Sequence, residues 1–91
     1  MLRLNCFISV VPEKRAEVIE AAKRLTGASL KEEGCVAYDI FESATRPNVL
    51  MICETWRDKE ALKAHSESDI FLEEVATMRG LGEMKLETFE F

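Results

Sequence analysis

The sequence lacks any long apolar run, and no stretch approaches the roughly 20 residues that a membrane-spanning helix requires. The N-terminus has no basic segment followed by an apolar one, so we expect no signal peptide. Cations are in deficit, with 12 Lys and Arg against 17 Asp and Glu, whereas a phosphate backbone is bound through clustered cations. We therefore expect a soluble, cytoplasmic protein with neither a membrane nor a nucleic acid as its partner.

Cysteine is scarce and shows no pairing pattern. Cys6, Cys35 and Cys53 lie far apart and form no CxxC motif, which is typical of reduced thiols in a cytosolic protein. Each lies in an expected strand, where cysteine usually acts as a small hydrophobe, although a nucleophilic role stays open. The single histidine and scattered carboxylates give no metal-ligand spacing, and Gly80-Leu81-Gly82 does not follow a strand as a phosphate loop would. No metal site is expected.

What is present is an ordinary globular composition, 47% hydrophobic and 32% charged, and the length suits one domain over residues 1–91. Alternating apolar and polar residues predict strands over 2–10, 35–42, 49–56 and 84–91. The third of these strands is apolar on both faces up to Glu54, which indicates a central position in the sheet.

Helices are expected between these strands. The first runs over about 12–33, with a proline in its first turn, and Gly34 ends it in the left-handed conformation. Asp58, and then Ser68 or Asp69, are N-caps for two short helices. This order predicts an α+β fold, a ferredoxin-like βαββαβ sandwich in which helices cover one face of an antiparallel sheet.

The uncovered face of such a sheet should be polar, yet strand parity assigns large apolar side chains to it. We expect there Phe7, Tyr38, Ile40, Leu50, Ile52 and Trp56. The last strand also has two apolar faces, with Met84 and Leu86 on one and Phe89 and Phe91 on the other. Two sheets packed face to face about a twofold axis would cover this surface, so a homodimer is expected. The alternative is a monomer with an exposed apolar groove.

The same face is expected to form a small-molecule site, because it combines apolar side chains with a few polar groups. By strand parity it gathers Asn5, Phe7, Glu54 and Trp56, with Tyr38 and Ile52 as neighbours. His65 follows the strand that ends at Trp56 and is the only side chain here that titrates near neutrality without perturbation.

Each candidate also has a structural interpretation. His65 is either a half-buried side chain bonded to backbone or a group that transfers a proton to or from a substrate. Glu54 either pairs with Arg3 or another strand cation, or has a raised pKa and acts as a base. Trp56 belongs either to a core or interface or to the site, and Asn5 is either a solvated edge residue or a substrate contact.

Five segments together resemble the antibiotic biosynthesis monooxygenase family of dimeric α/β barrels, in particular its small quinol monooxygenases. They are VVPE at 10–13, KEEGC at 31–35 with Tyr38 after it, CETW at 53–56, ALKAH at 61–65 and SDIF at 68–71. The resemblance implies oxygenation of quinol-like or polycyclic aromatics without metal, flavin or haem, the electron-rich substrate itself activating dioxygen. It also implies a site Asn on the first strand, matched by Asn5 or with a one-residue offset by Cys6, a Trp matched by Trp56, and a histidine matched by His65.

Two departures from the family pattern bear on the expected reaction. Asp69 stands where many members have a second histidine, and Val75 stands where the haem-degrading branch has its haem ligand, so haem degradation is not expected. The leading hypothesis is a monooxygenase without a cofactor that acts with dioxygen on a small quinol or polycyclic aromatic. Its catalytic residues would be His65, Asn5, Trp56 and Glu54, and its substrate contacts Phe7, Tyr38 and Ile52. The alternatives are a ligand-binding or stress-response dimer without catalysis, and an isomerase of a small carbonyl compound.

Overall fold

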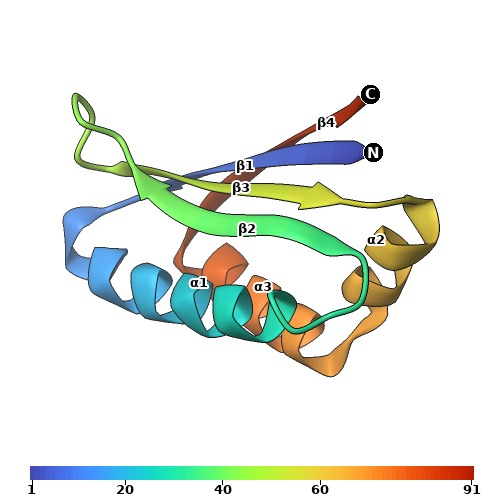
Figure 1. The fold of residues 1–91 in the computed structure, drawn as a ribbon. Helices are drawn as coiled ribbons and strands as arrows, with labels where there is room; N and C mark the ends of the chain where they lie inside the picture. Colours follow the sequence, from blue (N-terminus) through green and yellow to red (C-terminus); the bar gives the residue numbers. More distant parts are fainter.

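The computed structural model describes residues 1–91 and contains the expected order of strands and helices (Figure 1). The elements are β1 (Leu2–Val10), the 3-10 turn η1 (Pro12–Lys14), α1 (Arg15–Ser29), β2 (Cys35–Glu42), β3 (Val49–Trp56), α2 (Lys59–Glu67), α3 (Asp69–Leu81) and β4 (Gly82–Glu90). The four strands form one antiparallel sheet in the order β2-β3-β1-β4, with the helices on one side. The ferredoxin-like α+β fold is confirmed, and β3 is one of its two central strands.

The capping residues act as the sequence indicates. The Asp58 carboxylate accepts a hydrogen bond of 2.8 Å from the backbone N–H of Ala61, and the Ser68 hydroxyl accepts one of 3.3 Å from that of Phe71. These bonds satisfy N–H groups that a helix start leaves without partners. Helix α1 is shorter than expected, because it ends at Ser29 and residues 30–34 form a turn that closes at Gly34, which has φ of 82°.

The register of the sheet corrects the expected distribution of side chains between its two faces. Cys6 pairs with Ile52 and Ile8 with Leu50, so these β3 side chains lie on the helix-covered face with the buried residues of β1. Trp56, Tyr38 and Ile40 lie on that face too, since they pair with Leu2, Glu54 and Ile52. Their expected position on the open face is therefore wrong. A strand that is apolar on both sides gives no sign of which side faces the helices.

The open face keeps an apolar surface made of other residues. Phe41 and Phe7 both pair with Met51, which places these three side chains in one row across β2, β3 and β1. Phe89 lies on the same face, since it pairs with Arg3, and half of its surface is exposed. Met84 points the other way and packs against the core. The last strand therefore has apolar residues on both faces, as expected.

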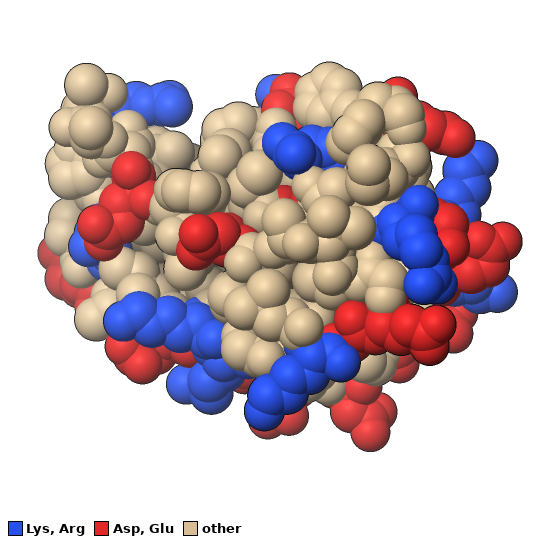
Figure 2. Space-filling model, viewed as in Figure 1, with Lys and Arg blue, Asp and Glu red and all other residues tan.

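The outer surfaces of the helices carry mixed charges. Figure 2 shows acidic and basic side chains interleaved along the helical side of the molecule, and one such pair is Lys23 and Glu20, 3.7 Å apart on α1. This pattern is that of solvated helix faces, as the sequence indicates. None of the helices is both long enough and apolar enough to cross a membrane.

Candidate functional site

A pocket of about 120 Å³ lies between the helix-covered face of the sheet and the helices α2 and α3. Eleven of the fifteen residues in its wall are hydrophobic, among them Ile52, Phe71 and Met78. The four polar residues of the wall are Glu54, His65, Ser66 and Arg79. A mainly apolar hollow with a few converging polar groups is the usual form of a small-molecule site.

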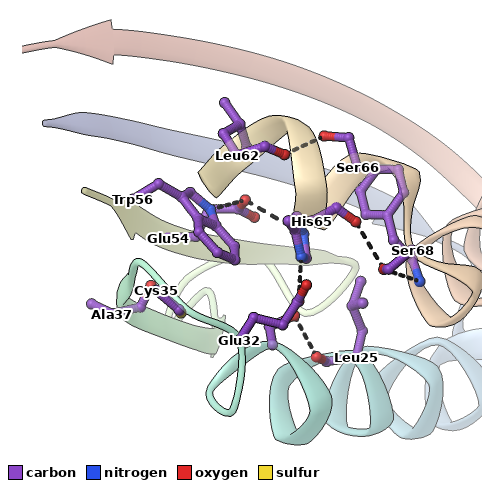
Figure 3. A network of polar contacts seen from close by, with 12 residues as sticks. Leu25, Glu32, Cys35, Ala37, Glu54, Trp56, Leu62, His65, Ser66 and Ser68 are labelled. Atoms are coloured by element: carbon purple, nitrogen blue, oxygen red, sulfur yellow. Dashed lines mark hydrogen bonds and ion pairs between the residues drawn. The ribbon is translucent and has the colours of Figure 1, made fainter. Parts of the chain in front are cut away.

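His65 is the central polar residue of this pocket. It lies in the last turn of α2, and its side chain is 1% exposed. Its Nδ1 lies 2.7 Å from Oε1 of Glu32, and its Nε2 lies 3.9 Å from Oε1 of Glu54 and has no hydrogen-bond partner (Figure 3). The expected alternative of a half-buried histidine bonded to backbone is wrong, because the ring is fully buried and bonded to a carboxylate.

Three aromatic rings enclose the imidazole. The ring centroid of His65 is 4.5 Å from that of Trp56, 4.9 Å from that of Phe71 and 5.6 Å from that of Tyr38. These contacts restrict the rotation of the imidazole, so that Nδ1 stays beside Glu32 and Nε2 on the side of Glu54.

Glu54 is a buried carboxylate without the expected cation. Arg3 instead donates to the Thr55 hydroxyl at 2.6 Å, because the register puts Arg3 and Thr55 on the open face and Glu54 on the other. The Glu54 carboxylate accepts a hydrogen bond of 2.9 Å from the indole N–H of Trp56. Burial raises the pKa of Glu54, and the opposing effects of the Trp56 N–H and of His65 do not cancel that rise. The expected pairing with Arg3 is wrong, and the raised pKa agrees with the alternative.

Residues 1–77 match the family model described as antibiotic biosynthesis monooxygenase. The chain belongs to this family. Bacillus subtilis YcnE, by its name a candidate monooxygenase, is 40% identical over 71 residues, which are 78% of this chain and 75% of that protein. A crystal structure from Bacteroides thetaiotaomicron, of a conserved protein described as a possible oxidoreductase, is 56% identical. It has a TM-score of 0.97 and covers 99% of this chain and 96% of that one.

The fold is also that of more distant members of the antibiotic biosynthesis monooxygenase family. A variant of the Streptomyces nogalater cofactor-independent oxygenase SnoaB superposes with a TM-score of 0.89 at 17% identity, covering 99% of this chain and 91% of that one. At this identity the similarity shows a shared fold. The expected family assignment and fold are thus confirmed.

The structure gathers part of the expected site of this family member around the pocket. Tyr38, Ile52, Glu54 and His65 line it, and Trp56 packs on His65. Asn5 and Phe7 do not join them, because they pair with Cys53 and Met51 on the open face. The offset position Cys6 does line the pocket.

The phenol and thiol of the pocket are not activated by their surroundings. Burial, followed by the charge of Glu54, raises the pKa of the Tyr38 hydroxyl and raises that of the Cys6 thiol to about 11. A nucleophilic cysteine needs a lowered pKa, so Cys6 acts as the small apolar side chain that the sequence favours. Of the pocket's buried side chains, His65 is the one with a nitrogen that has no hydrogen-bond partner.

Sequence reasoning missed Glu32. It lies 33 residues before His65 in the chain and is followed by a second glutamate in the same KEEGC segment. The signal that could have found it is Gly34, since a glycine that closes a turn with positive φ fixes where the preceding side chains point.

Proposed function

We propose that this protein is a monooxygenase without a cofactor that hydroxylates a single-ring quinol, with His65 as the base that activates the substrate. The observation that carries the proposal is the buried Nε2 of His65, a residue of the apolar pocket wall, which has no hydrogen-bond partner in the protein. Family membership supports oxygenation as the reaction class.

The size of the pocket favours one ring over several. Its volume of about 120 Å³ is close to the roughly 150 Å³ of an apolar protein cavity that admits benzene. A polycyclic substrate would need the walls to move apart. We therefore narrow the expected substrate from quinols and polycyclic aromatics to quinols of one ring.

His65 would start the reaction by accepting the phenolic proton on Nε2. The resulting phenolate is electron-rich enough to give electrons to dioxygen. One oxygen atom forms a new bond to a ring carbon and ends as a hydroxyl group. The O–O bond breaks, and the other oxygen leaves as water with the two hydrogens that the quinol loses when it becomes a quinone. All four electrons come from the substrate, so no further reductant is needed.

The remaining residues of the pocket would bind and orient the ring. Tyr38 and Ile52 supply its walls, while Trp56 holds the Glu54 carboxylate through its indole N–H. Arg79 is the only Lys or Arg side chain in the wall and has no ion-pair partner, so it would favour a substrate oxygen that carries negative charge.

The protein would work as a homodimer joined through the open faces of its sheets. The row formed by Phe7, Met51 and Phe41, together with Phe89 farther along the same face, is the surface that a second copy would cover. In this arrangement Asn5 and Phe7 serve the dimer contact rather than the pocket.

An oxygen electrode and a substrate panel test this proposal. Hydroquinone should consume dioxygen in a one-to-one ratio, an anthrone should consume little, and His65→Ala should abolish uptake without loss of the fold by circular dichroism. Binding of hydroquinone without oxygen uptake would instead indicate a ligand-binding module. Conversion of a small carbonyl compound without oxygen would indicate an isomerase.

A further inference from the structure

We propose that Glu32 is a positioning residue that holds His65 in the tautomer with its proton on Nδ1 and thereby directs the lone pair of Nε2 into the pocket. The catalytic consequence rests on the proposed function. The tautomer itself does not, and it can be measured without turnover.

The contact between Glu32 and His65 fixes the position of the proton. The carboxylate can only accept, so in the contact of 2.7 Å the hydrogen lies on Nδ1 of the imidazole. A neutral imidazole carries one N–H, and its other nitrogen is then an acceptor with a free lone pair. That nitrogen is Nε2, which is buried and lies 3.9 Å from Glu54, beyond hydrogen-bond distance.

An unpartnered buried nitrogen indicates that a ligand belongs beside it. Buried polar atoms in native proteins nearly always have a hydrogen-bond partner. Trp56 cannot supply one, because its N–H is already donated to Glu54. The group that completes Nε2 must therefore donate a hydrogen, as the hydroxyl of a phenol that enters beside His65 would do.

The backbone around Glu32 is built to hold this side chain against α2. Gly34 has φ of 82°, and a Cβ atom there would overlap the methyl group of Ala61 on α2. The backbone N–H of Arg57 donates to the carbonyl of Gly34 at 2.8 Å, and that of Cys35 donates to the carbonyl of Glu32 at 3.2 Å. The turn is thus tied to the start of α2, the helix that carries His65.

The neighbouring Glu33 provides a matched comparison. Its side chain is 89% exposed and lies 3.6 Å from the Arg57 guanidinium, on the solvent side of the same turn. The two glutamates have equal chemistry and adjacent positions, and only Glu32 contacts the imidazole.

Nitrogen NMR of the protein tests the tautomer directly. His65 is the only histidine, so protein labelled with ¹⁵N-histidine gives two ring nitrogens without ambiguity. In mildly alkaline buffer the wild type should show a protonated Nδ1 and a bare Nε2. Glu32→Ala should lose this single pattern, whereas Glu32→Gln should keep it, because the amide oxygen still accepts from Nδ1. Glu33→Ala should match the wild type.

Two results would overturn the proposal. The first is a wild-type spectrum with the proton on Nε2 or on both nitrogens, and this outcome needs no variant to fold. The second is an unchanged spectrum in Glu32→Ala.

Hydroquinone turnover adds a second measurement. Glu32→Ala should lower kcat about tenfold or more with little change in KM. This loss is part of the roughly 10²–10⁴-fold rate increase that a general base contributes. Glu33→Ala should change neither. If the wild type shows the Nδ1 tautomer but consumes no oxygen, the proposed function fails and the role of Glu32 in orienting the ring stands.

Discussion

Replacement of Gly34 by alanine tests how the turn between α1 and β2 is held, and its cost can be worked out from two separate effects. An L-residue in the left-handed region costs about 1–2 kcal/mol, and φ here is 82°. The new Cβ would also overlap the methyl group of Ala61, and overpacking of this kind costs about 1–3 kcal/mol. The expected destabilisation of Gly34→Ala is therefore about 2–5 kcal/mol.

Gly27 is the matched control within the same chain. It lies inside α1, and a Cβ atom there would have no neighbour within 4 Å. Gly27→Ala should therefore raise stability by about 0.4–1 kcal/mol, since alanine has the higher helix propensity and the less flexible unfolded state.

Urea unfolding of the two variants and of Gly34→Ala combined with Ala61→Gly gives the measurement. The second substitution removes the overlap but not the backbone strain, so it should recover only part of the loss. The reasoning is refuted if Gly34→Ala costs no more than about 0.5 kcal/mol, which is typical of an ordinary surface position. It is also refuted if Gly27→Ala is as destabilising as Gly34→Ala.

Three further predictions concern charge, reactivity and assembly. Burial raises the pKa of Glu54 above its ordinary 4.5, so the folded state binds this proton more tightly than the unfolded state. The free energy of unfolding of the wild type should then fall as pH rises from 4.5 through the folded pKa. The fall should be about 1.4 kcal/mol for each unit by which the folded pKa exceeds the unfolded one. Glu54→Gln, which keeps an acceptor for Trp56, should lack this fall. If the urea midpoints of both proteins change with pH in the same way, the loss of stability does not come from Glu54. Cys6, with its pKa raised to about 11, should react with iodoacetamide only after unfolding, unlike the more exposed Cys35 and Cys53. Rapid labelling at Cys6 in the native protein, located by peptide mass spectrometry, would show the pocket wall to be open. Phe41→Glu on the open face should give monomers by sedimentation, while Leu72→Glu, at a somewhat more exposed position on α3, should not. Sedimentation of the wild type as a monomer would contradict the proposed dimer.

The order of elements could be predicted because local chemistry decides it. Asp58 and Ser68 each precede a helix and have side chains that accept from its first N–H groups, so their positions marked the starts of α2 and α3. Gly34 was expected to end the first helix in the left-handed conformation. The conformation is confirmed, but the helix already ends at Ser29 and Gly34 closes the turn that follows it.

The assignment of faces could not be predicted for β3. Val49, Met51 and Cys53 are apolar on one side, and Leu50 and Ile52 are apolar on the other, so the alternation carried no information about which side meets the helices. Which side of β3 meets the helices depends on how its residues align with those of β1, and these two strands lie far apart in the sequence. Because the faces of β3 were exchanged, both Glu54 and Trp56 were expected on the open face, whereas they lie on the helix-covered one.

The polar core of the site was only partly visible in the sequence. His65 stands out as the only histidine, Glu54 as a carboxylate in an otherwise apolar strand, and Trp56 through the family resemblance. Glu32 does not, because it is one of two adjacent glutamates in a turn, and only the tertiary contact with α2 distinguishes it from Glu33.

The central claim is that His65, in a pocket the size of one ring, activates a quinol to react with dioxygen. Mass spectrometry of the products formed from hydroquinone under ¹⁸O₂ tests it most directly. The account predicts a hydroxyquinone that carries one ¹⁸O atom, with the second atom in water, and no such product from His65→Ala. An unlabelled product, or a labelled one formed equally well by His65→Ala, would contradict it.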